Sequence, residues 1–185
     1  MKVVAVGGSP RLAGNTNYLL DRVLDELASQ GIQTEKIILS QHQVNPCQGH
    51  DNCSEFPECP QKDDASWILD KFANADGILL ASPVYYAGPS AQMKAFVDRN
   101  NFLYKHGVEI KARCAGLIAV SAWDGTDEVI ETLTKFIKFS KNNTRVFSIA
   151  GHADKPGAIK DQPEIVQRAG EMGKQMAEAL RSGRK

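Results

Sequence analysis

The chain has 185 residues, with 22 basic and 22 acidic side chains and a formal net charge of zero. A length of this order fits a single domain, residues 1–185, that folds without a disulfide or a structural metal. The balanced charge, without a long basic run, excludes an electrostatic binding surface for nucleic acid or for a membrane. The apolar segments are too short to cross a bilayer or to form a signal peptide, so we expect a cytoplasmic protein.

Short β-rich apolar runs alternate along the chain with segments of helical spacing. The runs predict strands at residues 2–6, 34–39, 77–82, 114–121 and 145–149. Between the runs, apolar residues recur three or four positions apart, which predicts helices that place one apolar stripe against a sheet. These helices are expected at Asn17 to Ala28, at 67–72 (capped by Asp63 or Asp64), at 93–97, at 129–137, and from about Pro163 to Leu180 with an end at Gly183.

This alternation predicts an α/β fold, a flavodoxin-like three-layer sandwich. A five-stranded parallel sheet in the strand order 2-1-3-4-5 carries helices on both faces, because crossovers between parallel strands are right-handed. Such sheets bind ligands beyond the carboxyl ends of the strands, where the order switches between the first and third strands. The loops at residues 7–16 and 83–90 are therefore the expected binding site.

The first of these loops, GGSPRLAGNT, carries groups that bind a phosphate. Backbone N–H groups at a helix N-terminus favour an anion, and glycines let the backbone approach it. The hydroxyls of Ser9 and Thr16, the amide of Asn15 and the guanidinium of Arg11 are further donors. Neither the Walker motif nor the dinucleotide glycine motif is present. The alternative is a glycine turn in which Asn15 or Thr16 only caps the helix.

The second loop, SPVYYAGPS, places Tyr85 and Tyr86 between Pro83 and Gly88 at the end of a buried strand. Adjacent aromatic rings in this position make an apolar ledge with polar edges, which can hold a planar heterocycle. The alternative is that both tyrosines pack beneath the following helix.

GSPRLAGNT and SPVYYAGPSAQMKAFVDR together resemble the two flavin-binding segments of the NAD(P)H-dependent FMN reductase-like and iron-sulfur flavoprotein branch of the flavodoxin superfamily. The resemblance covers about residues 1–150 and implies a non-covalent FMN. The flavin itself carries the electrons, so no side chain is assigned as a catalytic acid or base. The FMN-site residues that the resemblance implies are Ser9, Arg11, Gly14, Asn15, Thr16, Pro83, Val84, Tyr85, Tyr86, Ala87, Gly88, Ala122, Trp123 and Gly125.

Three kinds of activity are compatible with these residues. The first is a reductase that takes hydride from NAD(P)H and passes electrons to a quinone, a free flavin or a similar small acceptor. The second is an electron carrier of the iron-sulfur flavoprotein type that exchanges electrons with protein partners, and the third is a flavin-binding module without turnover. The resemblance also implies a homodimer or homotetramer with the flavin site at the subunit interface. Tyr85, Tyr86 and the apolar residues 102–104 would otherwise be exposed.

Three of the four cysteines lie in one loop, residues 40–62, after the second strand. Iron-sulfur flavoproteins carry a compact CxxCxxC motif and a fourth cysteine here, whereas this chain reads Cys47, His50, Cys53 and Cys59. Histidine replaces cysteine on iron in Rieske centres, and three cysteines with one histidine also bind zinc. The loop is therefore expected to hold a [4Fe-4S] cluster or a zinc ion, or to be a degenerate loop without metal.

Overall fold

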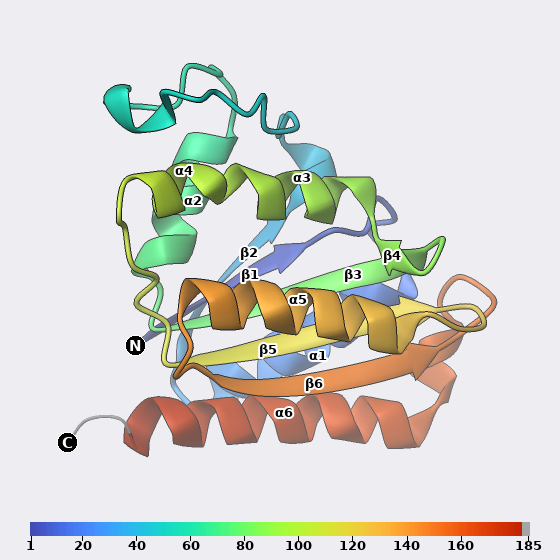
Figure 1. Cartoon of the computed structure of the whole chain (residues 1–185). Coiled ribbons are helices and arrows are strands. Elements are labelled where there is room, and N and C mark those ends of the chain that lie inside the picture. The colour runs from blue at the N-terminus through green and yellow to red at the C-terminus, as the bar shows by residue number, and fades with distance from the viewer. Residues whose placement is uncertain (183–185) are drawn as a thin grey trace.

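The computed structural model describes residues 1–182 and contains one sheet with helices on both faces (Figure 1). Its parallel strands are β1 (Lys2–Gly7), β2 (Gln33–Ile38), β3 (Gly77–Tyr85), β5 (Cys114–Ser121) and β6 (Arg145–His152). They lie side by side in the order β2-β1-β3-β5-β6. The predicted order 2-1-3-4-5 is therefore confirmed for these five strands.

A sixth strand was not predicted. β4 (Gly88–Pro89) pairs antiparallel with the end of β3, so that Val84 lies opposite Pro89 and Tyr85 opposite Gly88. Tyr86 and Ala87 form the turn of this hairpin, with φ angles of 50° and 58°. Left-handed φ angles at both turn residues fit the twist of a two-residue hairpin, although side chains larger than glycine disfavour them. β3 thus extends beyond its predicted end because the chain folds back to pair with it.

The helices form two layers that cover opposite faces of the sheet. α1 (Asn15–Ser29) and α6 (Pro163–Ser182) cover one face, and α2 (Ala65–Asn74), α3 (Ala91–Arg99) and α5 (Thr126–Ser140) cover the other. The five predicted helices are present, and the predicted end of the last one at Gly183 lies outside the described residues. A short α4 (Asn101–Lys105), which follows α3 at once, was not predicted.

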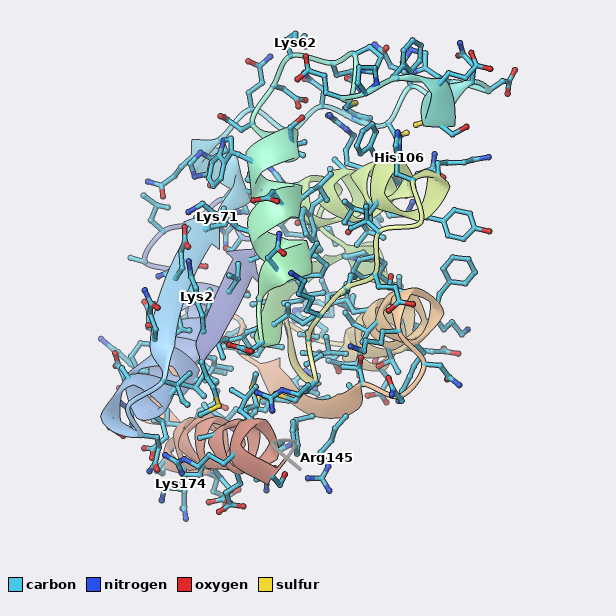
Figure 2. The ribbon with its side chains drawn as sticks, turned by 90° about the vertical axis from the view of Figure 1, so that its left-hand side faces the viewer. Lys2, Lys62, Lys71, His106, Arg145 and Lys174 are labelled. Carbon is cyan, nitrogen blue, oxygen red and sulfur yellow. The ribbon has the colours of Figure 1, made fainter. Side chains whose placement is uncertain are left out.

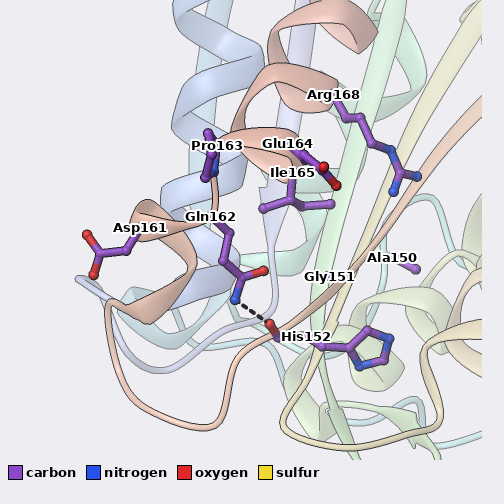
Figure 3. Close-up of a pocket in the computed structure, with 9 residues that line it drawn as sticks. All are labelled: Ala150, Gly151, His152, Asp161, Gln162, Pro163, Glu164, Ile165 and Arg168. Atoms are coloured by element: carbon purple, nitrogen blue, oxygen red, sulfur yellow. Dashed lines mark hydrogen bonds between the residues drawn. The ribbon is translucent and has the colours of Figure 1, made fainter.

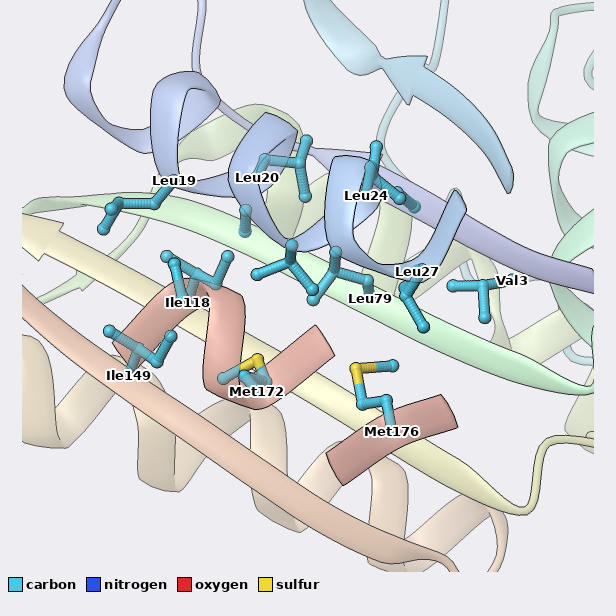
Figure 4. Close-up of a cluster of buried hydrophobic side chains, with 14 of the residues drawn as sticks. Val3, Leu19, Leu20, Leu24, Leu27, Leu79, Ile118, Ile149, Met172 and Met176 are labelled. Atoms are coloured by element: carbon cyan, nitrogen blue, oxygen red, sulfur yellow. The ribbon is translucent and has the colours of Figure 1, made fainter. Parts of the chain in front are cut away.

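Each face of the sheet buries its own apolar core. Neighbouring positions of a strand point to opposite faces, so Val3 packs towards α1 and α6 while Val4 packs towards α2 and α3. Figure 4 shows the first core, in which leucines of α1 meet Met172 and Met176 of α6 over β3 and β5. Because both faces of the central strands are covered, their sequences are almost continuously apolar. In residues 1–182, no helix is long and apolar enough to cross a membrane.

Two hydrogen bonds join the loop after β1 to β3 and α3. The backbone N–H of Gly8 donates to the carbonyl oxygen of Ala81 at 2.7 Å, and the Ser90 hydroxyl donates to the carbonyl oxygen of Gly8 at 2.7 Å. A side chain at position 8 would begin 2.8 Å from Met93 Cβ and from Ser90 Oγ. Glycine at this position therefore lets the two predicted binding loops approach closely at the carboxyl edge of the sheet.

Candidate functional site

A cavity of about 350 Å³ lies at the carboxyl ends of β1, β3 and β5, where the strand order switches. A larger cavity, of about 530 Å³, lies at the edge of the sheet between β6 and α6 and contains none of the predicted site residues. We take the smaller cavity as the candidate site because its walls are the two predicted loops. The predicted residues that line it are Ser9, Arg11, Gly14, Asn15, Thr16, Pro83, Val84, Tyr85 and Ala122.

Asn17, which was not predicted, holds the first loop in shape. Its side-chain amide is fully buried and donates to the carbonyl oxygens of Arg11, at 2.9 Å, and Leu12, at 3.3 Å. The Ser9 hydroxyl is also buried and accepts the N–H of Arg11 at 3.3 Å. The loop therefore brings Ser9 and Arg11 to the beginning of α1, where first-turn N–H groups have no partner within the helix. Free amides, a hydroxyl and a guanidinium are the groups that can bind a phosphate.

Asn15 has a structural role that the sequence did not indicate. Its amide nitrogen donates to the carbonyl oxygen of Lys155 at 2.9 Å, and its amide oxygen accepts the N–H of Ile159 at 3.2 Å. The side chain of Asn15 thus ties the loop after β6 to α1. Only the backbone N–H of Asn15 is left to contact a ligand. The N-cap of α1 is Gly14, without a side-chain capping bond, so the alternative that Asn15 or Thr16 caps this helix is wrong.

The loop after β6 forms a wall of the cavity that the sequence analysis missed. No local motif marks this loop, but β6 is parallel to β5, so both strands end at the same edge of the sheet. That rule of topology is the signal that could have found it. The lining residues that were not predicted are Val120, Ser121, Ala153, Asp154, Lys155 and Pro156.

Five predicted residues lie outside the cavity, on the hairpin and on the loop before α5. Tyr86 is fully exposed and Trp123 is 86% exposed, so both project from the rim. Tyr85 is 43% exposed, and the alternative that both tyrosines pack beneath α3 is therefore wrong. Gly125 has a φ of 87°, and a side chain there would begin 2.8 Å from Val84 Cγ1, so this residue supports the hairpin from outside. The five residues are Tyr86, Ala87, Gly88, Trp123 and Gly125.

Arg99, at the end of α3, fastens the cysteine loop to the fold. Its guanidinium is 1% exposed and donates to Asp63 Oδ2 at 2.5 Å, to the carbonyl oxygen of Asn45 at 3.1 Å and to Cys59 Sγ at 3.2 Å. Asp63 also accepts the N–H groups of Asn45, at 2.9 Å, and Ala65, at 3.1 Å. One buried ion pair therefore joins both ends of the loop to α3.

Both members of this pair are held in the charged form. Burial alone would raise the pKa of Asp63, but the hydrogen bonds from Arg99, Asn45 and Ala65 outweigh it and hold the pKa below its ordinary value. Burial opposes the charge of Arg99, yet Asp63 and the Cys59 thiol raise its pKa above the ordinary value. The two side chains therefore form a compensated charge pair in the protein interior.

The predicted metal ligands share one loop. The Cys53 thiol is buried, and burial followed by the proximity of Cys59 and Cys47 raises its pKa. The His50 ring packs edge-on against Phe56, with 5.7 Å between ring centroids. Within residues 1–182, no three cysteine, histidine or acidic side chains are gathered in a group that could hold a metal ion. The donor types suit an iron–sulfur cluster or zinc, but these side chains are not assembled around a common centre.

His106 fixes the far side of this loop. It follows α4 (Figure 2), and its ring nitrogens lie 2.8 Å from the carbonyl oxygens of Phe102 and Phe56. Since one nitrogen of a neutral imidazole carries no proton, at most one of these contacts is then a hydrogen bond, and protonation of the ring allows both. His106 therefore packs the segment around Phe56 onto α4.

Comparisons with known proteins agree with this architecture. The sequence model of the NADPH-dependent FMN reductase family matches residues 1–154. The chain is 35% identical over 190 residues to an iron-sulfur flavoprotein of Methanocaldococcus jannaschii, an alignment that covers 98% of each chain. An NAD(P)H:quinone oxidoreductase from Methanothermobacter marburgensis matches with a TM-score of 0.70 and 15% identity, covering 94% of this chain and 95% of that one. A flavodoxin from the domain Archaea matches with a TM-score of 0.62 and 14% identity, covering 98% and 99%.

The family match spans both loops that carry the resemblance, and the solved structures share the sheet and its helices. The predicted family, the FMN cofactor and the flavodoxin-like fold are confirmed. The chain belongs to the NADPH-dependent FMN reductase family and is an FMN-dependent oxidoreductase with a flavodoxin-like fold.

Proposed function

We propose that the cavity at the switch point binds FMN and that the protein passes electrons from NAD(P)H to a small acceptor, such as a quinone or a free flavin. The observation that carries this proposal is the arrangement of the cavity. The anion-binding start of α1 forms one wall, and the ledge from Pro83 to Tyr85 forms another. Bound FMN supplies the hydride chemistry, while the protein supplies binding, orientation and charge.

Different residues of the chain are placed to bind the phosphate and the flavin ring. Ser9, Thr16 and the first-turn N–H groups of α1 are placed to bind the phosphate, and Arg11 adds a positive charge at the rim. Pro83 and Tyr85 offer an apolar surface to the flavin ring. The exposed side chains of Tyr86 and Trp123 stand beside the opening, where an acceptor would enter.

Turnover with small acceptors tests this function. The purified protein, loaded with FMN, should oxidise NADH or NADPH several-fold faster when a benzoquinone or free FMN is added. The rate of NADH or NADPH oxidation is measured under anaerobic conditions from the loss of absorbance at the nicotinamide band. Bound flavin that is reduced but is reoxidised by neither acceptor would contradict the reductase and leave an electron carrier or a flavin-binding module.

The cysteine loop supports a second function, electron exchange with a protein partner through an iron–sulfur cluster. The M. jannaschii relative is named an iron-sulfur flavoprotein. Here Cys47, His50, Cys53 and Cys59 would be the ligands, and the guanidinium of Arg99 would hydrogen-bond the Cys59 sulfur and compensate negative charge. Histidine is an established replacement for cysteine on iron.

Metal analysis after anaerobic purification tests the loop. The second function requires iron and acid-labile sulfide together with flavin. His50→Ala should lower the iron content and His50→Cys should raise it, because a thiolate is the commoner ligand. Cys114→Ala is the matched control, since Cys114 is buried in β5 and burial raises the pKa of its thiol to about 12. Zinc alone, or no metal, would contradict the cluster.

The exposed aromatic rim favours a homodimer or homotetramer. Tyr86 and Trp123 flank the site, and a second patch joins Tyr104, 63% exposed, to Phe139, 73% exposed, with ring centroids 5.3 Å apart. Exposed apolar groups of this kind mark contact surfaces. Light scattering of the FMN-loaded protein should give at least twice the chain mass, and Trp123→Lys should lower it. A monomer mass for the unmodified protein would contradict the assembly.

A further inference from the structure

Ser121 and His152 lie opposite each other at the ends of neighbouring parallel strands. Ser121 is the last residue of β5 and His152 the last residue of β6, and the strand register pairs them. The Ser121 hydroxyl lies 3.0 Å from His152 Nδ1, within hydrogen-bonding distance. Ser121 is 5% exposed and lines the FMN cavity, so this contact reaches the wall of the functional site.

His152 also belongs to the larger cavity on the other side of this contact. That cavity, of about 530 Å³, lies between β6 and the beginning of α6 (Figure 3). The Gln162 amide donates to the carbonyl oxygen of His152 at 2.8 Å, which fixes the backbone while the ring turns away from Gln162. The imidazole is exposed to solvent. The pair therefore connects solvent in one cavity with the wall of the other.

The direction of this hydrogen bond depends on the proton at Nδ1. When Nδ1 carries no proton, it accepts the Ser121 hydroxyl, and the serine oxygen offers only lone pairs to the cavity. When His152 is protonated, Nδ1 donates to the serine oxygen, and the hydroxyl hydrogen is free to point into the cavity. For the neutral tautomer that carries its proton on Nε2, protonation of His152 therefore changes Ser121 from an acceptor to a donor towards the cavity.

We infer that Ser121 and His152 act as a positioning pair that couples the uptake of a proton by His152 to the reduction of bound FMN. The inference rests on the proposed FMN cavity. Hydride transfer from NAD(P)H brings one proton and two electrons, releases NAD(P)⁺ and leaves one additional negative charge in the cavity. A proton from water in the larger cavity, held on His152, balances that charge, and the donor that Ser121 then presents stabilises it.

The charges around the pair are mixed. The charged side chains that line the larger cavity beside His152 are Asp161, Glu164 and Arg168. Those that line the FMN cavity beside Ser121 are Arg11, Asp154 and Lys155. Three are basic and three acidic, so their charges balance formally at neutral pH. Among the residues that line the two cavities, His152 is the one histidine, so replacing it removes the imidazole and leaves these six charges unchanged.

The midpoint potential of bound FMN, measured from pH 5 to pH 8, tests the pair. His152→Gln keeps a polar side chain that does not titrate, and Ser121→Ala removes the hydroxyl that makes the link. In both variants the midpoint potential should depend less steeply on pH than in the unmodified protein. The number of protons taken up for every two electrons should fall by up to one. The control is His42→Gln, at a histidine that packs edge-on against Trp67 and lines neither cavity, and it should keep the full dependence.

Each outcome decides the inference. Equal pH dependence in His152→Gln and the unmodified protein would overturn it. A change in His152→Gln but not in Ser121→Ala would also overturn it, since the charge would then act without the hydroxyl. Flavin fluorescence first checks that all four proteins bind FMN. If the unmodified protein does not, the proposed cavity fails, which is distinguishable from failure of the pair.

Discussion

Replacing Arg99 by methionine should lower the free energy of unfolding by about 3–5 kcal/mol, because it leaves Asp63 as an uncompensated buried charge. Both side chains are almost completely buried, with 1% and 0% of their side-chain surface exposed. The substitution also removes the hydrogen bonds from Arg99 to Asn45 and Cys59, which lowers the stability further. Urea denaturation followed by circular dichroism measures the effect.

A matched pair on the same helix provides the control. Lys94 and Asp98 also form an ion pair on α3, but their side chains are 54% and 43% exposed. Lys94→Met should therefore change the free energy of unfolding by less than about 1 kcal/mol. If Arg99→Met were as mild as Lys94→Met, the ion pair would not be what fastens the cysteine loop.

The buried ion pair of Arg99 and Asp63 also predicts a loss of stability in acid. The pKa of Asp63 in the folded protein lies below its ordinary value of 3.8, so the folded state binds the proton less readily than the unfolded state. Its contribution to stability is fully present above that ordinary value and is lost as the pH falls through the lower folded value. Below about pH 4, the unmodified protein should therefore lose more stability than Asp63→Asn, which has no carboxylate to protonate there.

The parts of the fold that follow from local patterns could be predicted from the sequence. The continuous apolar runs of β3 and β5 exist because helices cover both faces of these strands, and that requirement is visible residue by residue. The position of the site followed from the strand order, since a switch point is a property of topology. The loop GSPRLAGNT and the ledge at Tyr85 therefore met in the structure as predicted.

Contacts between distant parts of the chain were not predictable in this way. Asn15 looked like a capping residue or a phosphate ligand, but its partners are 140 and 144 residues away in sequence. Ser121 is an ordinary strand residue until β6 brings His152 beside it. Asp63 was predicted to cap a helix and no role was predicted for Arg99, because the sequence does not show that the cysteine loop folds over both. Their roles depend on packing between elements, which periodicity does not encode.

FMN should bind at least tenfold more tightly than riboflavin. The two ligands share the flavin ring and differ in the phosphate, so their ratio isolates the site at the beginning of α1. A hydrogen bond to a charged group contributes about 1.5–3 kcal/mol, and tenfold corresponds to about 1.4 kcal/mol. One such bond from Ser9 or from a first-turn N–H group therefore accounts for the ratio, and several would raise it further. Quenching of flavin fluorescence on titration with the protein measures both dissociation constants.

Variants of two arginines distinguish the contribution of the phosphate to binding from that of the flavin ring. Arg11 lines the cavity, whereas Arg22 lies on the exposed side of α1 and contacts Asp25. Arg11→Ala should weaken FMN several-fold and leave riboflavin almost unchanged, because only the phosphate carries the charge that the guanidinium attracts. Arg22→Ala should affect neither ligand. Equal affinity for FMN and riboflavin would contradict the phosphate site, and an equal loss for both ligands in Arg11→Ala would instead place Arg11 against the ring.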